Sequence, residues 1–341
     1  MQVLKNTILQ RQLNFDEQLV KLYVLALTIK RYMALIIEVN HLSKKFNDTY
    51  AVNDLSFTVN EGDIYGFLGQ NGAGKSTTIR MLLTLIKPTA GEINLFEKKL
   101  SAHRSEILKK VGAVIEKPDL YKYLSAYDNL SIFARMSGIK ITKQLLMQQL
   151  QMVGLEERAK DNVRTFSQGM KQRLGIAVAL VHNPALIILD EPTNGLDPQG
   201  IADMRNLILR LSREMGKTVL ISSHLLSEIE LIANRMIIIH KGKKMVEGNV
   251  SALLDPAHTL IEIDTLDNAV AKKLLLQSKW ASFLQNKIDL QLMMNKTAVP
   301  QLINELVAMG VQIRSVNSSH SLENYFLSLT TQSGHVDAFA N

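Results

Sequence analysis

The sequence predicts an α/β protein with a mainly parallel sheet, followed by a smaller α+β unit. Between residues 33 and 255, segments typical of strands alternate with segments typical of helices, which favours a parallel sheet with helices on its faces. The runs 185–189 and 218–221 are continuously apolar, as expected for strands that are buried on both sides. An apolar fraction of 46% with 21% charged residues is that of an ordinary folded protein.

The pattern divides the 341-residue chain into three parts. Residues 1–32 contain no recognisable motif, and we interpret them as an N-terminal extension. That extension is either a stretch translated upstream of the native start or an amphipathic helix that touches a membrane. Residues 33–255 form the main domain, in which the mostly helical segment 104–182 indicates an inserted helical subdomain. Pro256 marks the start of a C-terminal α+β domain over residues 256–341.

Local signals place the individual elements. A capping box at residues 125–128 predicts the start of one helix of the helical subdomain, and another helix is expected at 141–153. In the main domain, early strands are expected at 35–39, 55–59 and 64–68. In the C-terminal domain, strands are expected at 260–263, 288–293 and 311–316, and helices at 269–278, 299–309 and 322–329.

Composition limits the classes of site and partner. The chain has no cysteine, which excludes disulfides and thiolate metal sites and fits a reducing cytoplasm. A net charge of +7 is compatible with nucleic acid or an anionic membrane surface as a partner. It is equally compatible with a mixed surface that carries a lysine excess, because the basic residues are spread along the chain. The charge alone therefore identifies no partner.

No segment of the sequence predicts a membrane span. A spanning helix needs about 20 apolar residues, and the nearest candidate, residues 19–29, is shorter and contains Lys21. Lys30 and Arg31 follow it, where a secretory signal would have a small-residue cleavage site. We expect a soluble protein, so that any membrane process it serves depends on another chain.

The stretch 69–76 matches the phosphate-binding loop, in which two glycines five residues apart are followed by Lys and Ser. The expected strand 64–68 precedes it, and a helix at 77–85 follows. Backbone N–H groups and the positive helix end would face a polyanion, Lys75 would place its charge near the outer phosphates, and Ser76 would offer its hydroxyl to Mg²⁺. The expected nucleoside-triphosphate site consists of Gly69, Gln70, Asn71, Gly72, Ala73, Gly74, Lys75, Ser76 and Thr77.

Two carboxylates follow the apolar run 185–189. Ligands bind at the carboxyl ends of strands in open α/β sheets, so both side chains are expected at the ligand edge. Asp190 is suited to hold Mg²⁺ directly or through water. Glu191 is placed to orient or deprotonate an attacking water.

Four further motifs resemble those of one family. The segment 165–173, Thr-Phe-Ser-Gln-Gly-Met-Lys-Gln-Arg, precedes the carboxylate pair with the spacing of an ABC (ATP-binding cassette) signature. Residues 194–198 look like the D-loop of that family, and residues 222–224, Ser-Ser-His, look like its switch histidine. Phe46 stands where the family has the aromatic side chain that stacks on adenine. Residues 33–255 therefore resemble an ABC cassette.

The resemblance is closest to the cassettes of ABC-2-type exporters, and within them to the bacitracin-resistance and lantibiotic-immunity ATPases. The segments 62–69, 221–224 and 321–326 carry it. It implies a P-loop NTPase fold with an antiparallel β edge and a helical subdomain. It also implies ATP and Mg²⁺ as ligands, and a head-to-tail homodimer with two ATPs in its interface.

The family resemblance assigns roles to single residues. The catalytic residues would be Glu191, His224 and Lys75. Beyond the phosphate loop, the nucleotide would be bound by Phe46, Ser167, Gln168, Gly169 and Asp197, and the signature residues would bind the ATP of the partner copy. The helix that begins after Ser167 would form a second anion-binding helix end, which agrees with this picture.

Two positions depart from the family pattern. Gln168 stands where the signature usually has glycine, although Ser167 and Gly169 are kept. Glu116 occupies the position of the glutamine loop, and the bacitracin-type group resembles this chain in that substitution. A carboxylate there can approach Mg²⁺ but adds negative charge near the γ-phosphate. The expected metal-binding residues are therefore Ser76, Asp190 and Glu116.

The leading hypothesis is a transporter motor, in which ATP closes the dimer and drives a separate membrane permease. The protein would then lie in the cytoplasm at the inner face of the cell membrane, with no nucleic acid as partner. The alternative is a soluble ABC ATPase that acts on nucleic acid or ribosomes, which the net charge allows. The domain 256–341 would be either a flap that stabilises the dimer or a regulatory ligand-binding module.

Overall fold

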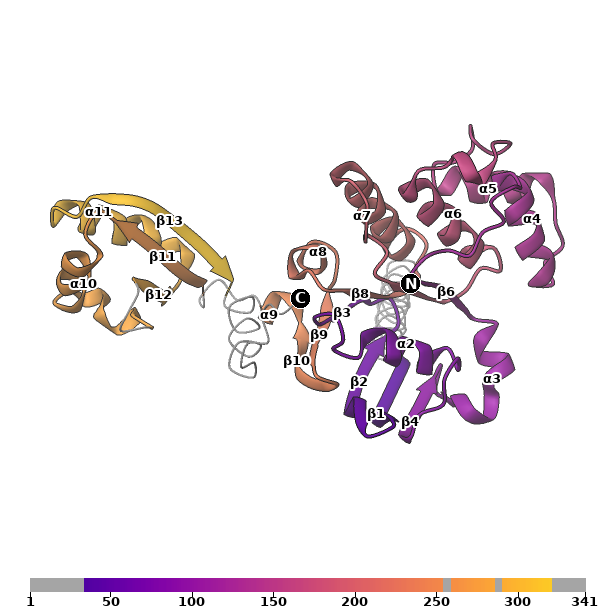
Figure 1. Cartoon of the computed structure of the whole chain (residues 1–341), viewed down its shortest axis with the longest axis horizontal. Coiled ribbons are helices and arrows are strands. Elements are labelled where there is room, and N and C mark those ends of the chain that lie inside the picture. Colours follow the sequence, from indigo (N-terminus) through magenta and orange to yellow (C-terminus); the bar gives the residue numbers. More distant parts are fainter. Residues whose placement is uncertain (1–33, 254–258, 286–289, 321–341) are drawn as a thin grey trace, which may run out of the picture. The chain divides into compact units, whose positions relative to one another are not determined.

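The computed structural model describes residues 34–253, 259–285 and 290–320. Two compact units, Met1–Glu247 and Gly248–Asn341, make up the chain (Figure 1). The boundary between the two units lies before Pro256, the residue at which the sequence predicts it. The units are defined by contacts between residues, which a single proline does not determine. Pro256, the expected extension 1–32 and the expected helix 322–329 all lie outside the described residues.

A six-stranded sheet forms the centre of the first unit, with the order β10-β9-β3-β8-β7-β6. The strands are β3 (Ile64–Leu68), β6 (Val111–Ile115), β7 (Leu186–Asp190), β8 (Thr218–Ser223), β9 (Arg235–His240) and β10 (Lys243–Asn249). From β6 to β9 all neighbours pair in parallel. Every residue of β3, β7 and β8 is buried. The predicted α/β class with doubly covered strands is confirmed.

A second, four-stranded sheet has the order β2-β1-β4-β5 and is antiparallel. Its strands are β1 (Leu35–Phe46), β2 (Thr49–Asn60), β4 (Ala90–Leu95) and β5 (Lys98–Lys99). Phe57 of this sheet contacts Phe67 of β3 edge-to-face, with 5.3 Å between the ring centroids. The two sheets and helix α2 (Lys75–Leu82) thereby share one apolar core.

Three helices form the helical subdomain, α4 (Ala126–Met136), α5 (Lys143–Met152) and α6 (Gln168–Leu180), and they pack on one another. The predicted capping box is confirmed, since Ser125 Oγ accepts from the Asp128 N–H at 3.0 Å. The expected range 104–182 starts too early. Its residues 111–115 form β6, because this short run rich in valine pairs with β7 in the main sheet. Helix α3 (Leu100–Leu108) packs beside β4, β5 and β6.

In its described residues, the second unit contains a three-stranded antiparallel sheet, in the order β12-β11-β13, with one α-helix after β11 and another after β12. Short helix α9 (Val250–Leu253) precedes it. The remaining elements are β11 (Thr259–Thr265), α10 (Asn268–Leu276), β12 (Gln291–Met294), α11 (Val299–Ala308) and β13 (Ile313–His320). Ile261, Leu275 and Leu306 belong to its own apolar core. The predicted α+β class is therefore confirmed for this unit. Over the three described ranges, every helix lacks the combination of length and apolar character that crossing a bilayer requires.

Candidate functional site

The loop between β3 and α2 has glycines at positions where a side chain would collide with the backbone or strain it. Gly74 has φ 106°, and a Cβ on it would lie 2.5 Å from the Ala51 carbonyl oxygen of β2. Gly72 also has a left-handed φ, 80°, with open space at its Cβ position. No side chain caps the N-terminus of α2. Its first N–H groups are therefore available to an anion.

Lys75 lies at the centre of this loop with only 5% of its surface exposed. Its ammonium donates to the carbonyl oxygens of Gly69 at 2.6 Å and Gln70 at 3.3 Å. Nζ also lies 3.0 Å from Oε1 of Glu191, as an ion pair. That oxygen is buried without a hydrogen-bond partner, so the contact is one of charge and not of hydrogen-bond geometry. The sequence-predicted lysine and glutamate are thus brought together.

Asp190 ends β7 and is fully buried. Its Oδ1 accepts from Ser222 Oγ at 2.6 Å, and Ser222 Oγ accepts in turn from the Glu191 N–H at 2.9 Å. Its Oδ2 is buried and has no hydrogen-bond partner. Leaving a buried charged oxygen unsatisfied is costly, and carboxylate oxygens are ligands that Mg²⁺ prefers. The residues present therefore fit a magnesium ion.

Glu191 makes a second contact, with His224. Glu191 Oε2 lies 2.7 Å from Nδ1 of His224. An ionised carboxylate only accepts, so Nδ1 carries the proton in this contact. Donation from Nε2 to a phosphate then requires the cationic ring or the loss of this contact. Lys75, Glu191 and His224, the three predicted catalytic residues, thus lie in one continuous cluster.

Glu116 is positioned differently from the expectation. It follows β6, but its side chain is 61% exposed and Oε1 accepts from Nη2 of Arg80 at 2.7 Å. The carboxylate is thus engaged by an arginine of α2 and not by the cluster of Lys75 and Glu191. Its backbone carbonyl accepts from Nε2 of Gln172 on α6 at 3.3 Å. A metal-binding role for Glu116 would need its release from Arg80.

The predicted signature residues begin helix α6. Ser167 is its N-cap, with Oγ accepting from the Met170 N–H at 3.3 Å. At Gly169, an added Cβ would make an ordinary contact with Cδ2 of Leu196 at 3.7 Å, and Ser167 itself is exposed. Gln168 is the first residue of α6 and is accommodated there without a glycine. Ser167, Gln168 and Gly169 therefore form a second helix end, in the helical subdomain.

Two other predicted nucleotide-binding residues lie at the ends of elements. Asp197 caps α7 (Pro198–Arg213), with Oδ1 accepting from the Gly200 N–H at 2.9 Å, so its carboxylate has a structural role. Phe46 ends β1 and is 49% exposed. The ammonium of Lys44 lies 4.9 Å from its ring centroid, a cation–π contact. One face of the ring is therefore occupied.

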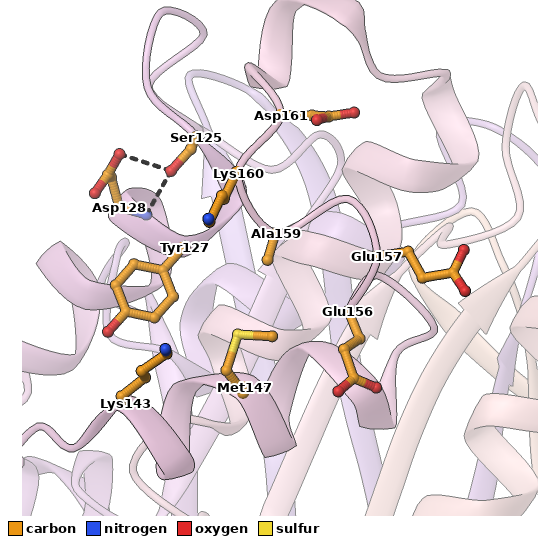
Figure 2. Close-up of a pocket in the computed structure, with 10 residues that line it drawn as sticks. All are labelled: Ser125, Tyr127, Asp128, Lys143, Met147, Glu156, Glu157, Ala159, Lys160 and Asp161. Atoms are coloured by element: carbon orange, nitrogen blue, oxygen red, sulfur yellow. Dashed lines mark hydrogen bonds between the residues drawn. The ribbon is translucent and has the colours of Figure 1, made fainter.

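A separate pocket of ≈ 780 Å³ lies in the helical subdomain (Figure 2). Its lining side chains come from α4, α5 and residues 156–161, and none of them is a predicted site residue. They mix acidic groups with Lys143 and Lys160, and Figure 2 shows the ammonium of Lys143 turned toward the ring of Tyr127. This pocket is thus distinct from the cluster around Lys75.

Comparisons with known proteins agree with this geometry. The family model described as ABC transporter matches residues 52–194. An uncharacterised ABC transporter ATP-binding protein of Bacillus subtilis, YhcH, is 40% identical and the alignment covers 87% of this chain and 97% of that protein. The bacitracin transport ATP-binding protein BcrA of Enterococcus faecalis is 39% identical, with the same coverage of both chains.

Solved structures show the same relationship. The cassette MJ0796, in a dimeric post-hydrolysis state bound to ADP and Pi, is 26% identical and gives a TM-score of 0.57. The superposition covers 63% of this chain and 98% of that cassette. Relatives that are 39–40% identical over nearly their full length show the family. The chain therefore belongs to the ATP-binding subunits of ABC transporters, and it is an ATPase with the P-loop fold.

Proposed function

We propose that this ATPase powers export through a separate membrane permease, and that two copies close on ATP in a head-to-tail dimer. The observation that carries the proposal is that one chain has two helix N-termini suited to an anion: that of α2, which has no side-chain cap, and that of α6, where Ser167 is exposed. The end of α2 lies beside Lys75, and the end of α6 begins at Ser167 in the helical subdomain. The two helix ends would contact the same nucleotide if a second copy placed the N-terminus of its own α6 against the phosphates.

In this dimer each residue of the cluster has one task. Lys75 binds the outer phosphates, and Ser76 and Asp190 hold Mg²⁺, which would neutralise phosphate charge when bound. Glu191 orients the attacking water and takes its proton, and His224 contacts the γ-phosphate. Phe46 stacks on the adenine with the ring face that Lys44 leaves free.

The membrane partner would dock on the loop between β6 and α4. This loop exposes Tyr121 and Tyr123, the latter at 81%, and tyrosine is enriched at protein interfaces. It starts at Glu116, whose carbonyl is hydrogen-bonded to Gln172 of α6. Relatives of this chain are named for bacitracin and lantibiotic transport, which favours export over the alternative of a nucleic-acid-dependent ATPase. The protein would then lie at the inner face of the membrane.

The Glu191→Gln variant tests the proposal. We expect turnover to fall by roughly 100-fold or more, the size typical of losing a catalytic base, while ATP still binds and stabilises the dimer. Size-exclusion chromatography with and without Mg·ATP measures the second effect. The matched control is Glu157→Gln, an exposed carboxylate of the helical-subdomain pocket, which should behave like wild type. A Glu191→Gln protein that stays monomeric with Mg·ATP would refute the closing dimer.

A further inference from the structure

Glu228 joins two segments of the site through one oxygen atom. Its Oε2 accepts from Ser223 Oγ at 2.9 Å and from Thr193 Oγ1 at 2.8 Å. Ser223 ends β8 directly before His224, and Thr193 comes two residues after Glu191. The carboxylate therefore bridges the two chain segments that carry the His224–Glu191 contact.

The bridge is anchored to the core. Glu228 lies on α8 (Leu226–Glu230), and its neighbour Ile229 is fully buried. A Cβ on Gly66 of β3 would lie 2.3 Å from Cγ2 of Ile229, so the missing side chain at Gly66 lets α8 approach the sheet (Figure 1). The packing of Ile229 on the sheet does not involve the Glu228 carboxylate. Replacing Glu228 should therefore leave α8 packed.

The bridge also reaches the phosphate loop and the loop before α7. The Ser223 carbonyl oxygen accepts from the Gly69 N–H at 3.3 Å, at the start of the phosphate loop. The Thr193 carbonyl oxygen accepts from the Leu196 N–H at 3.1 Å, within the turn that leads to Asp197. Any shift of the segment 193–197 would therefore be passed to the switch histidine through Glu228.

We infer that Glu228 is a positioning residue for ATP hydrolysis, which keeps the segment 193–197 and His224 in register. The inference rests on the proposed roles of Glu191 and His224. An ionised carboxylate suits the task, because one oxygen can accept from two hydroxyls and hydrogen bonds to a charged acceptor are stronger than neutral ones.

The first test compares three variants by steady-state ATPase kinetics. Glu228→Ala should lower kcat about tenfold, the size expected for losing hydrogen bonds to a charged acceptor, and leave KM for ATP within about twofold. Glu228→Gln keeps an acceptor oxygen and should restore most of the lost turnover. Glu230→Ala, a carboxylate two residues along the same helix, is the matched control and should match wild type. A normal kcat for Glu228→Ala would overturn the inference.

The second test asks whether Glu228 acts through Thr193. Thr193→Val removes only the hydroxyl, and in a double-mutant cycle its effect should vanish in the Glu228→Ala background. Fully additive effects would show that Glu228 does not act through this contact. Glu191→Gln in the same assay distinguishes failure of the proposed function from failure of the inference about Glu228. If Glu191→Gln remains active, the proposed function fails; if it is inactive while Glu228→Ala is normal, only the present inference fails.

Discussion

The two helix N-termini of the candidate site, those of α2 and α6, differ in how the chain already uses them. The end of α2 has no side-chain cap, and a buried lysine stands beside it, held by two carbonyl oxygens and paired with Glu191. The N-terminus of α6 is capped by the side chain of Ser167, and the basic side chain in its first turn is Lys171. We therefore expect the first to bind a polyanion by itself and the second to add to a phosphate that is held elsewhere. This difference predicts separate effects on binding and on turnover.

The largest effect is expected at the first helix end. Lys75→Ala removes the lysine that is paired with Glu191, and ATPase activity should fall roughly 100-fold or more, as when one preorganised stabilising group is lost. Nucleotide binding should weaken as well, because Lys75 contacts the ground state and the transition state alike. Equilibrium binding of a fluorescent ATP analogue measures this. Tight binding by the Lys75→Ala protein would remove the proposed distinction between the two ends.

A smaller, more selective effect is expected at the second end. Ser167→Ala should leave ATP binding by the single chain unchanged and lower turnover about tenfold, close to the loss of one hydrogen bond to a charged group. It should also cost about 1 kcal/mol of folding stability as a lost N-cap.

A second helix N-cap in the chain provides the control for Ser167→Ala. Thr142 caps α5 in the same way, with Oγ1 accepting from the Leu145 N–H at 3.1 Å. Thr142→Ala should lose a similar amount of stability, about 1 kcal/mol, and keep full turnover. If thermal unfolding and ATPase activity fall together in both variants, Ser167 is only a helix cap.

The smallest effect is expected at Phe46, where the adenine base of ATP would stack. Phe46→Ala should raise KM for ATP by about fivefold, the lower limit for loss of one base–aromatic stack, and leave kcat nearly unchanged. Phe46→Tyr keeps an aromatic face and should bind ATP normally. Lys44→Met, which removes the ammonium beside the ring, should change KM by less than Phe46→Ala. Equal affinity of wild type and Phe46→Ala for ATP would place the adenine elsewhere.

Local sequence signals were enough for the fold class and for the centre of the site. The glycine spacing around Lys75 and the apolar run before Asp190 each specify a strand end, and the sheet then brings these ends together. The bridge from Ser222 to Asp190 and Glu191 could not be foreseen, since β7 and β8 are far apart in sequence and only their register aligns them.

The remaining differences have the same origin. Arg80 is an ordinary helix residue in the sequence, and only the fold brings it against Glu116, 36 residues away. The sequence of β6 does not separate it from the helical segment, because its five residues lie between helices and pairing with β7 decides that they form a strand. Glu228 carries no local signal either. Contacts between segments that are distant in sequence, and not residue type, determine the partner of Glu116, the strand state of β6 and the position of Glu228.

The environment of Lys75 has one more consequence. An ammonium has three N–H bonds, and the carbonyl oxygens of Gly69 and Gln70 occupy two of them. The carboxylate of Glu191 lies 3.0 Å from Nζ as an ion pair without hydrogen-bond geometry, so the third N–H is available to an incoming phosphate. We expect nucleotide binding to replace the ion pair between Lys75 and Glu191 by one between Lys75 and a phosphate, which would free Glu191 to contact the attacking water.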